Sequence, residues 1–169
     1  QKLTTFPAPR MQDNAIHYHH TGGVYEPGSG KRINQQEAAA LVAHVLATLR
    51  SPGFRYTEAT SIGIVTFNTQ QQSLIEDLLE AERAKDETLE PYFAENNPEG
   101  IFVKNLENVQ GDERGVIYFS TTFGRDARGR MSMNFGPLNL QGGERRLNVA
   151  ITRARSGMHV FTSLMPEDI

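Results

Sequence analysis

The sequence predicts an α/β fold, in which a parallel sheet carries helices on both of its faces. Two short segments, Ser61–Phe67 and Val116–Thr122, have the apolar, β-branched and aromatic composition of strands that are buried inside a sheet. Residues 35–50 and the segment that begins at Thr69 instead repeat apolar residues at helical spacing. Strands that alternate with helices are joined by crossovers, and crossovers make neighbouring strands parallel.

Length and composition indicate a single domain. The 169 residues suffice to bury most of the apolar surface in one core. Hydrophobic residues make up 38% of the chain, and no apolar run approaches the roughly 18 residues that span a bilayer. The first residues lack the apolar stretch of a signal peptide. The lack of cysteine excludes disulfides and thiolate metal sites and is compatible with a reducing compartment. We therefore expect a cytoplasmic protein without a membrane partner.

Charge is distributed unevenly along the chain. The net charge is −3, yet residues 76–100 hold nine acidic and two basic side chains, whereas residues 123–155 hold seven basic and two acidic ones. The acidic run is typical of a solvated helix face. A basic region within a mildly acidic domain favours a local anionic ligand over general coating of nucleic acid.

Residues 1–30 are expected to form an irregular leading segment, and residues 31–169 the core. Within the leading segment, Ile16–His20 can form a short edge strand. Its histidines, His17, His19 and His20, suggest a metal site, because alternate residues of a strand face the same way. No carboxylate or fourth ligand lies nearby in the sequence, so solvated histidines are favoured and no metal site is predicted.

The segment Gly28–Lys31 resembles part of a phosphate-binding P-loop but does not fit its pattern. The motif G-x-x-x-x-G-K-[ST] would require glycine at Tyr25 and serine or threonine at Arg32. A turn is the better interpretation. The chain is therefore expected to lack a Walker A motif of its own.

Helix boundaries can be predicted from capping residues. Asn34, with Glu37 three residues later, indicates a variant capping box for a helix over residues 35–50. Its buried face would consist of Ala38, Leu41, Val42, Val45, Leu46 and Leu49. In the helix that begins at Thr69 the inward residues would be Leu74, Ile75, Leu78 and Leu79.

The segment Gly142–Arg155 predicts an arginine-rich helix over residues 144–155. At 100° per residue, one face would hold Leu147, Ala150, Ile151 and Ala154. Arg146 and Arg153, two turns apart, would share a flank, and Arg155 would point about 160° away from Arg153. Gly157 would end the segment, before a strand over Met158–Thr162. Position alone would favour surface salt bridges for these arginines.

The residues themselves resemble conserved motifs of superfamily 1 helicases. RRLNVAITRAR, residues 145–155, is similar to motif VI, and the resemblance implies that Arg153 reaches the γ-phosphate of ATP. GIVTFNTQQQSLIEDLL, residues 63–79, resembles motif IV, with Gln71 at the usual glutamine and Gln72 where the family has an arginine. Residues 103–113 resemble motif V; Gln110, Gly111 and Glu113 match, whereas Asn105 and Glu107 replace threonine and aspartate.

The segment Gly124–Gly136 is predicted to be a long basic loop. Arg125, Arg128 and Arg130 could contact a phosphate backbone. Disorder of the loop in the isolated domain is an equally supported alternative.

The three motifs span residues 61–155 and imply the second RecA-like domain of a superfamily 1 helicase. The implied subgroup is that of the RNA-surveillance helicases, within a large bacterial helicase-related protein. The implied partners are nucleic acid, with DNA favoured over RNA, and an N-terminal RecA-like domain of the same protein. That other domain would bind most of the ATP and Mg²⁺, so the 169 residues alone should be inactive.

The resemblance also assigns roles to individual residues. The catalytic pair would be Arg153 and Arg146, with ATP contacted by Gln71, Gly111, Glu113 and Arg153, and nucleic acid by Asn105, Gln110, Arg125, Arg128 and Arg130. Two alternatives remain open: a degenerate module that binds nucleic acid without hydrolysing ATP, and a stand-alone α/β nucleotide-sensing domain.

Overall fold

Five parallel strands form the centre of the protein. The computed structural model describes residues 16–28, 30–132, 134–135, 139 and 141–168. The strand order in the sheet is β1-β5-β4-β2-β3, and every neighbouring pair is parallel. The strands are β1 (Ile16–His20), β2 (Ile62–Thr66), β3 (Phe102–Asn105), β4 (Arg114–Ser120) and β5 (Ala154–Thr162). The predicted parallel α/β class is confirmed.

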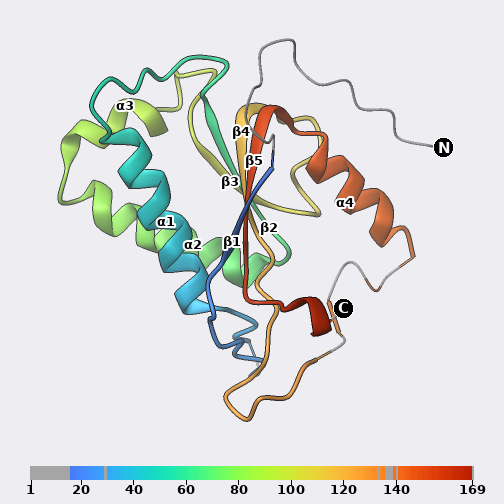
Figure 1. Cartoon of the computed structure of the whole chain (residues 1–169). Coiled ribbons are helices and arrows are strands. Elements are labelled where there is room, and N and C mark those ends of the chain that lie inside the picture. The colour runs from blue at the N-terminus through green and yellow to red at the C-terminus, as the bar shows by residue number, and fades with distance from the viewer. Residues whose placement is uncertain (1–15, 29, 133, 136–138, 140, 169) are drawn as a thin grey trace.

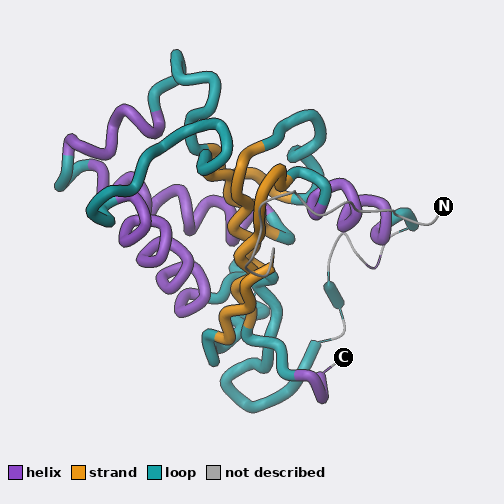
Figure 2. Tube along the Cα trace, turned by 45° about the horizontal axis from the view of Figure 1, so that its top comes forward, coloured by secondary structure: helices purple, strands orange, loops and turns teal. Residues whose placement is uncertain are grey.

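Helices cover both faces of this sheet. They are α1 (Gln35–Leu49), α2 (Thr69–Arg83), α3 (Glu90–Phe93) and α4 (Gly143–Ile151), with 3₁₀ turns at Glu87–Leu89 and Pro166–Asp168. Helices α1, α2 and α3 lie on one side of the strands and α4 on the other, with the strands as one layer between them (Figures 1 and 2). Among the described residues, no helix is long and apolar enough to cross a membrane.

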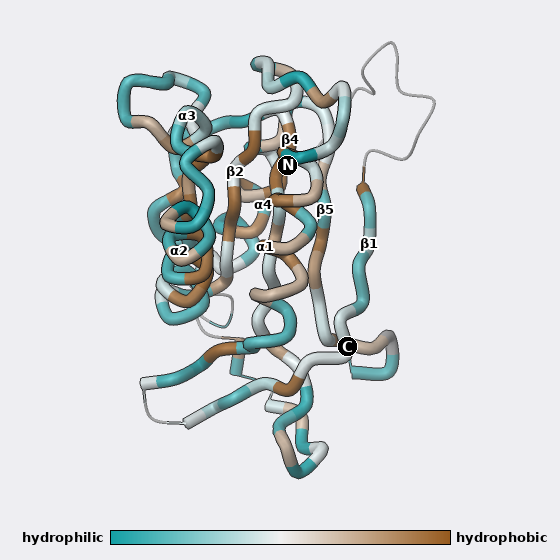
Figure 3. Tube along the Cα trace, turned by 90° about the vertical axis from the view of Figure 1, so that its left-hand side faces the viewer, coloured by the Kyte–Doolittle hydropathy of each residue, from teal (hydrophilic) through white to brown (hydrophobic). Residues whose placement is uncertain are grey.

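The larger apolar core lies between the sheet and the α1–α2 pair. All six predicted inward residues of α1 are buried, and so are Ile75 and Leu79 of α2. Leu74 and Leu78 are partly buried and pack against the same core. The interior strand β2 is hydrophobic, whereas β1 at the sheet edge is mostly hydrophilic (Figure 3). The helical periodicity therefore identified the correct inner face of α1 and α2.

The predicted cap of α1 is confirmed only in part. Asn34 Oδ1 accepts a hydrogen bond from the backbone N–H of Glu37 at 3.1 Å, as an N-cap should. The Glu37 side chain does not return to the cap, because it is fully buried between α1 and the ends of β4 and β5. There it accepts hydrogen bonds from Ser120 Oγ, the Thr122 N–H and Ser163 Oγ. A residue predicted to close a capping box instead joins a helix to two strands.

The region of the arginine-rich helix differs most from expectation. Helix α4 ends at Ile151 rather than at residue 155, and β5 begins at Ala154 rather than at Met158. The predicted inward residue Ile151 is 38% exposed. Pairing with β4 explains the difference, because Ala154 lies opposite Arg114 and the ladder continues through Phe161. The local sequence of residues 152–155 is compatible with a helix. Strand pairing with β4 places Ala154 and Arg155 in β5 instead.

Two predictions about the N-terminal third are confirmed. Ile16–His20 is an edge strand, so the leading segment 1–30 is not irregular throughout. Gly28 and Lys31 form a turn, with a hydrogen bond from Lys31 N–H to Gly28 O at 2.9 Å. The Lys31 ammonium pairs with Glu26 at 3.1 Å, and an antiparallel bridge joins Glu26 to Ile33.

Candidate functional site

A cavity lined by both polar and apolar side chains lies on the α4 face of the sheet. It has a volume of about 330 Å³, and one wall is the loop that follows β3 while the other is α4. The loop contributes Leu106, Glu107 and Gln110, and the helix contributes Arg145, Arg146 and Val149. The residues that resemble motifs V and VI therefore face one cavity, although about 35 residues of chain separate them.

The loop wall is shaped by a glycine with an unusual backbone. Gly111 has φ +94°, in the left-handed region that side chains other than glycine rarely adopt. A Cβ at this position would meet nothing within 4 Å, so the space beside the backbone is open among the described residues. The preceding Gln110 is exposed and offers an amide with both a donor and an acceptor. This loop leaves room for a ligand to approach its backbone closely.

Arg153 lies just after α4 and caps its C-terminal end. Its Nε–H donates to the Val149 carbonyl at 3.0 Å, and its Nη2 donates to Thr152 Oγ1 at 3.1 Å. Its Nη1 lies 3.6 Å from Glu113 Oε1, which places the guanidinium beside the motif V loop. The expectation that Arg153 stands out from a helical flank beside Arg146 is wrong, because the helix stops two residues before Arg153. The side chain is only 20% exposed.

Arg155 is also placed differently from the prediction. It lies on β5, not opposite Arg153 on a helix, and it contacts the same carboxylate: its Nε is 3.7 Å from Glu113 Oε2. Its Nη1 is 3.2 Å from Glu99 Oε2 and 3.4 Å from Glu58 Oε1. Hydrogen bonding to Glu99 raises the pKa of Arg155. Arg153 and Arg155 thus share one acidic partner and are not independent of each other.

One predicted site residue, Asn105, holds the motif V loop together from inside. Asn105, at the end of β3, is only 5% exposed; its Nδ2 donates to Gln72 Oε1 at 2.9 Å and to Thr69 Oγ1 at 3.2 Å. Its Oδ1 accepts from the Glu107 N–H at 2.9 Å. These bonds tie the motif V loop to the start of α2, where motif IV lies.

Gln71, the other glutamine of motif IV, is completely buried on the opposite face of the sheet. Its Oε1 accepts from the Asn34 N–H at 2.9 Å, and its Nε2 donates to Asn34 O and Ser120 Oγ, both at 3.1 Å. It belongs to the same buried polar cluster as Glu37. The structure therefore does not bring Gln71 to the cavity with Arg146.

The basic loop after β4 is folded where the structure describes it. Arg125 and Met131 form an antiparallel bridge, and Asp126 accepts hydrogen bonds from the backbone and side chain of Arg130. Arg125 pairs with the buried carboxylate of Asp168 near the end of the chain. Arg128 is exposed. The segment is a loop, as predicted, and of the two alternatives the disordered loop does not fit residues 125–131, which these hydrogen bonds hold in a turn.

The site suits phosphate better than a metal ion. Arg145 and Arg146 line the cavity, and guanidinium groups bind phosphate oxygens through paired N–H donors. Across the described residues, three or more side chains that could hold a metal come together only at three histidines, none of which lines this cavity. The sequence did not single out Arg145 as a lining residue, because the side of α4 that faces the loop after β3 is set by tertiary packing.

Five parallel strands, helices on both faces and an arginine-rich cavity define an α/β domain of the RecA-like type. The chain belongs to the AAA domain family, which matches residues 4–164.

Two curated relatives are similar to the chain. It is 43% identical over 112 residues, 64% of its length, to the uncharacterized ATP-dependent helicase MG140 of Mycoplasma genitalium. It is 36% identical over 137 residues, 80% of its length, to the homologue of that helicase in Mycoplasma pneumoniae. The aligned parts make up 9% and 12% of those relatives, so the chain corresponds to about a tenth of each. The chain is a helicase-type domain.

Proposed function

We propose that this chain is the second RecA-like motor domain of an ATP-dependent superfamily 1 helicase or translocase. In this proposal ATP and Mg²⁺ are bound mainly by the first RecA-like domain of the same protein. The present domain supplies guanidinium groups to the phosphates and part of the surface that follows the nucleic acid, with DNA favoured over RNA. The names of the two relatives support ATP use and a nucleic-acid partner.

The observation that carries the proposal is the meeting of the motif V loop and the motif VI helix at one cavity. The cavity joins Gln110 to Arg145 and Arg146, and Glu113 links the same loop to Arg153. Positive groups held in place before the reaction stabilise the charge that develops on a transferred phosphoryl group. Arg153 does not line the cavity: it lies beside the motif V loop, bonded to Val149 O and Thr152 Oγ1, and its guanidinium would have to leave part of this network to contact a phosphate.

Substitution of Arg153 in the parent protein tests the proposal. Arg153→Ala should lower kcat for ATP hydrolysis by about 10³-fold, the scale of an arginine finger, and leave the affinity for ATP largely unchanged. Because the side chain also caps α4, the variant should lose about 1 kcal/mol of unfolding free energy. Arg153→Lys keeps the positive charge but loses the planar guanidinium with its paired N–H donors. Compared with Arg153→Ala, this variant should therefore regain more of the unfolding free energy than of kcat.

Arg50→Ala is the matched control. Arg50 is the residue that ends α1 on the opposite face, and its Nη2 lies 2.9 Å from Asp86 Oδ2. Its loss should cost a similar small amount of stability and leave ATP hydrolysis unchanged. Equal kcat for Arg153→Ala and the unaltered parent would show that Arg153 is a structural cap only.

The isolated chain provides a second test. The 169 residues lack a Walker A motif, so they should show no ATP hydrolysis and only weak nucleotide binding. Turnover by the purified chain that disappears on substitution of a residue within it would contradict the proposed division between two domains. Tight nucleotide binding without turnover would favour a stand-alone nucleotide-sensing domain.

A degenerate module that binds nucleic acid is the second candidate. Gln72 stands where the resembling family has an arginine, and its amide already bonds Glu76 Oε1 at 2.9 Å and the Val103 carbonyl at 3.2 Å. A neutral side chain engaged in this way contributes no second positive charge to a phosphate. An ATPase assay on the parent, with and without nucleic acid, separates the two: a motor is stimulated by nucleic acid, and a degenerate module binds it without hydrolysis.

A further inference from the structure

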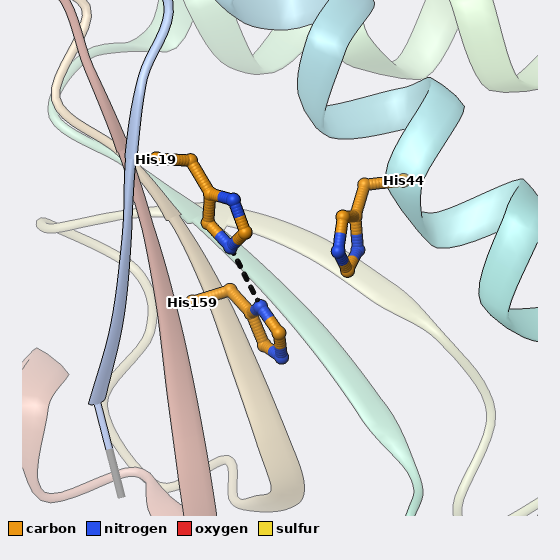
Figure 4. Close-up of side chains that lie close together, drawn as sticks. All are labelled: His19, His44 and His159. Atoms are coloured by element: carbon orange, nitrogen blue, oxygen red, sulfur yellow. Dashed lines mark hydrogen bonds between the residues drawn. The ribbon is translucent and has the colours of Figure 1, made fainter. Parts of the chain in front are cut away.

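Three histidines from separate parts of the chain converge beside the edge of the sheet. His19 lies on the edge strand β1, His159 on the neighbouring strand β5, and His44 on α1 above them (Figure 4). One ring nitrogen from each gives a set of three that all lie within 4.8 Å of one another. His19 Nε2 and His159 Nδ1 are 2.9 Å apart, with one of the two nitrogens donating a hydrogen to the other.

The spacing is close to that of ligands on a zinc ion. Imidazole nitrogens bind Zn²⁺ at about 2.0–2.1 Å, and two such nitrogens at a tetrahedral angle are then about 3.3 Å apart. The His19–His159 pair needs to open by only a few tenths of an ångström. The ring centroid of His44 is 4.9 Å from each of the other two rings, and the three ligand nitrogens lie within 4.8 Å of one another, so His44 must move toward the pair to complete the site.

The surroundings also favour a metal ligand role. His44 Nδ1 is buried and has no hydrogen-bond partner in the part of the chain that the structure describes. The rings of Tyr118 and Phe161 lie next to the cluster, so its walls are aromatic. Burial lowers the pKa of all three histidines, that of His159 to about 4, which keeps the nitrogen lone pairs free near neutral pH.

We propose that His19, His44 and His159 form a zinc site, with a water molecule at the fourth position. All three ligands are nitrogen, a set that suits Zn²⁺ rather than Mg²⁺ or Ca²⁺. The site lies on the face opposite the arginine-rich cavity, so it is separate from the proposed phosphate site. Bound zinc would fasten the edge strand β1 to α1 and β5.

Titration of the tag-free 169-residue chain with ZnCl₂ tests this site. Calorimetry should give one Zn²⁺ per chain. With free zinc at about a hundred times the dissociation constant, Tm should rise by about 5–10 °C. Co²⁺ used in place of Zn²⁺ should give the visible absorption of a four-coordinate nitrogen site, a readout that does not depend on stability.

Two variants separate this site from adventitious binding. His44→Gln and His19→Gln should each weaken Zn²⁺ binding by at least tenfold and abolish the cobalt absorption. His20→Gln is the control, because His20 is exposed on the same strand, outside the cluster, and its loss should leave both signals unchanged. No binding by the unaltered chain, or equal binding by His44→Gln and the unaltered chain, would overturn the proposal.

Discussion

The two faces of the sheet differ in how much apolar surface their helices bury. On one face, two helices of 15 residues each cover the strands with an apolar core that includes Leu41, Val45 and Ile64, all 0% exposed. On the other face, one helix of nine residues packs through a smaller set, and its Leu147 and Val149 are only partly buried. That second face carries the cavity, its arginines and the motif V loop.

If the cavity binds phosphate as proposed, stability and recognition are divided between the two layers of helices. A long amphipathic helix that buries a whole stripe contributes most of the burial energy on its face. A short helix that keeps several charged groups near a cavity buries less and leaves polar atoms available to a ligand. Substitutions on the two faces should therefore separate into losses of stability and losses of activity.

The largest effect on stability is expected in the core beneath α1. Leu41→Ala should lower the free energy of unfolding by about 3 kcal/mol, because the fully enclosed side chain leaves a cavity. The matched change on α4, Leu147→Ala, should cost about 1 kcal/mol, since that side chain is only partly buried. Urea unfolding of the 169-residue chain measures both. Equal losses would mean that the two faces contribute equally to stability.

The next effect concerns Glu37, the buried carboxylate on the same face. Burial raises its pKa from 4.5 to about 7, although hydrogen bonds from Ser120, Thr122 and Ser163 act in the opposite direction. The folded state therefore binds this proton more tightly than the unfolded state. Its contribution to stability is fully present below pH 4.5 and is lost as the pH rises through about 7, by up to roughly 3 kcal/mol.

Comparison with Glu37→Gln isolates that effect from other carboxylates. The pKa values of Asp86 and Asp126 are lowered by hydrogen bonds, chiefly from Thr88 and from the Arg130 backbone, so they destabilise the fold on acidification. The stability of Glu37→Gln relative to the unaltered chain should therefore rise between pH 5 and pH 8. Unfolding measured at several pH values checks this; a constant difference across that range would show that Glu37 does not titrate there.

Effects smaller than those of Leu41 and Glu37 are expected in the basic loop after β4. Arg125→Ala should lower the free energy of unfolding by about 1–2 kcal/mol, because it leaves the Asp168 carboxylate, whose side chain is 1% exposed, without its ion pair. Urea unfolding of the 169-residue chain measures this loss.

Arg128→Ala should change the free energy of unfolding by less than about 0.5 kcal/mol. If Arg128 contacts phosphate in the parent, its loss should reduce the slope of log affinity for nucleic acid against log salt by about one. An unchanged slope would show that Arg128 does not contact phosphate in the parent protein.

The family resemblance and the fold class could be predicted from short stretches of sequence. Residues 145–155 carry enough matching positions to show a resemblance to motif VI, and α1 could be placed within one residue of its observed end from its cap and apolar spacing. These features are local: each depends on residues within a few turns of one another. The parallel sheet followed from the alternation of strands with helices.

The sequence by itself therefore determined the α/β class, the inner face of α1 and α2, the edge strand β1 and the turn at Gly28–Lys31. Only the tertiary structure decided where α4 ends, because pairing with β4 drew Ala154 into β5 and took Arg153 and Arg155 off the helix. It also decided the partners of Glu37 and the meeting of His19 with His159, 140 residues apart. Such contacts join segments whose approach is set by strand pairing and core packing, and no local spacing encodes them.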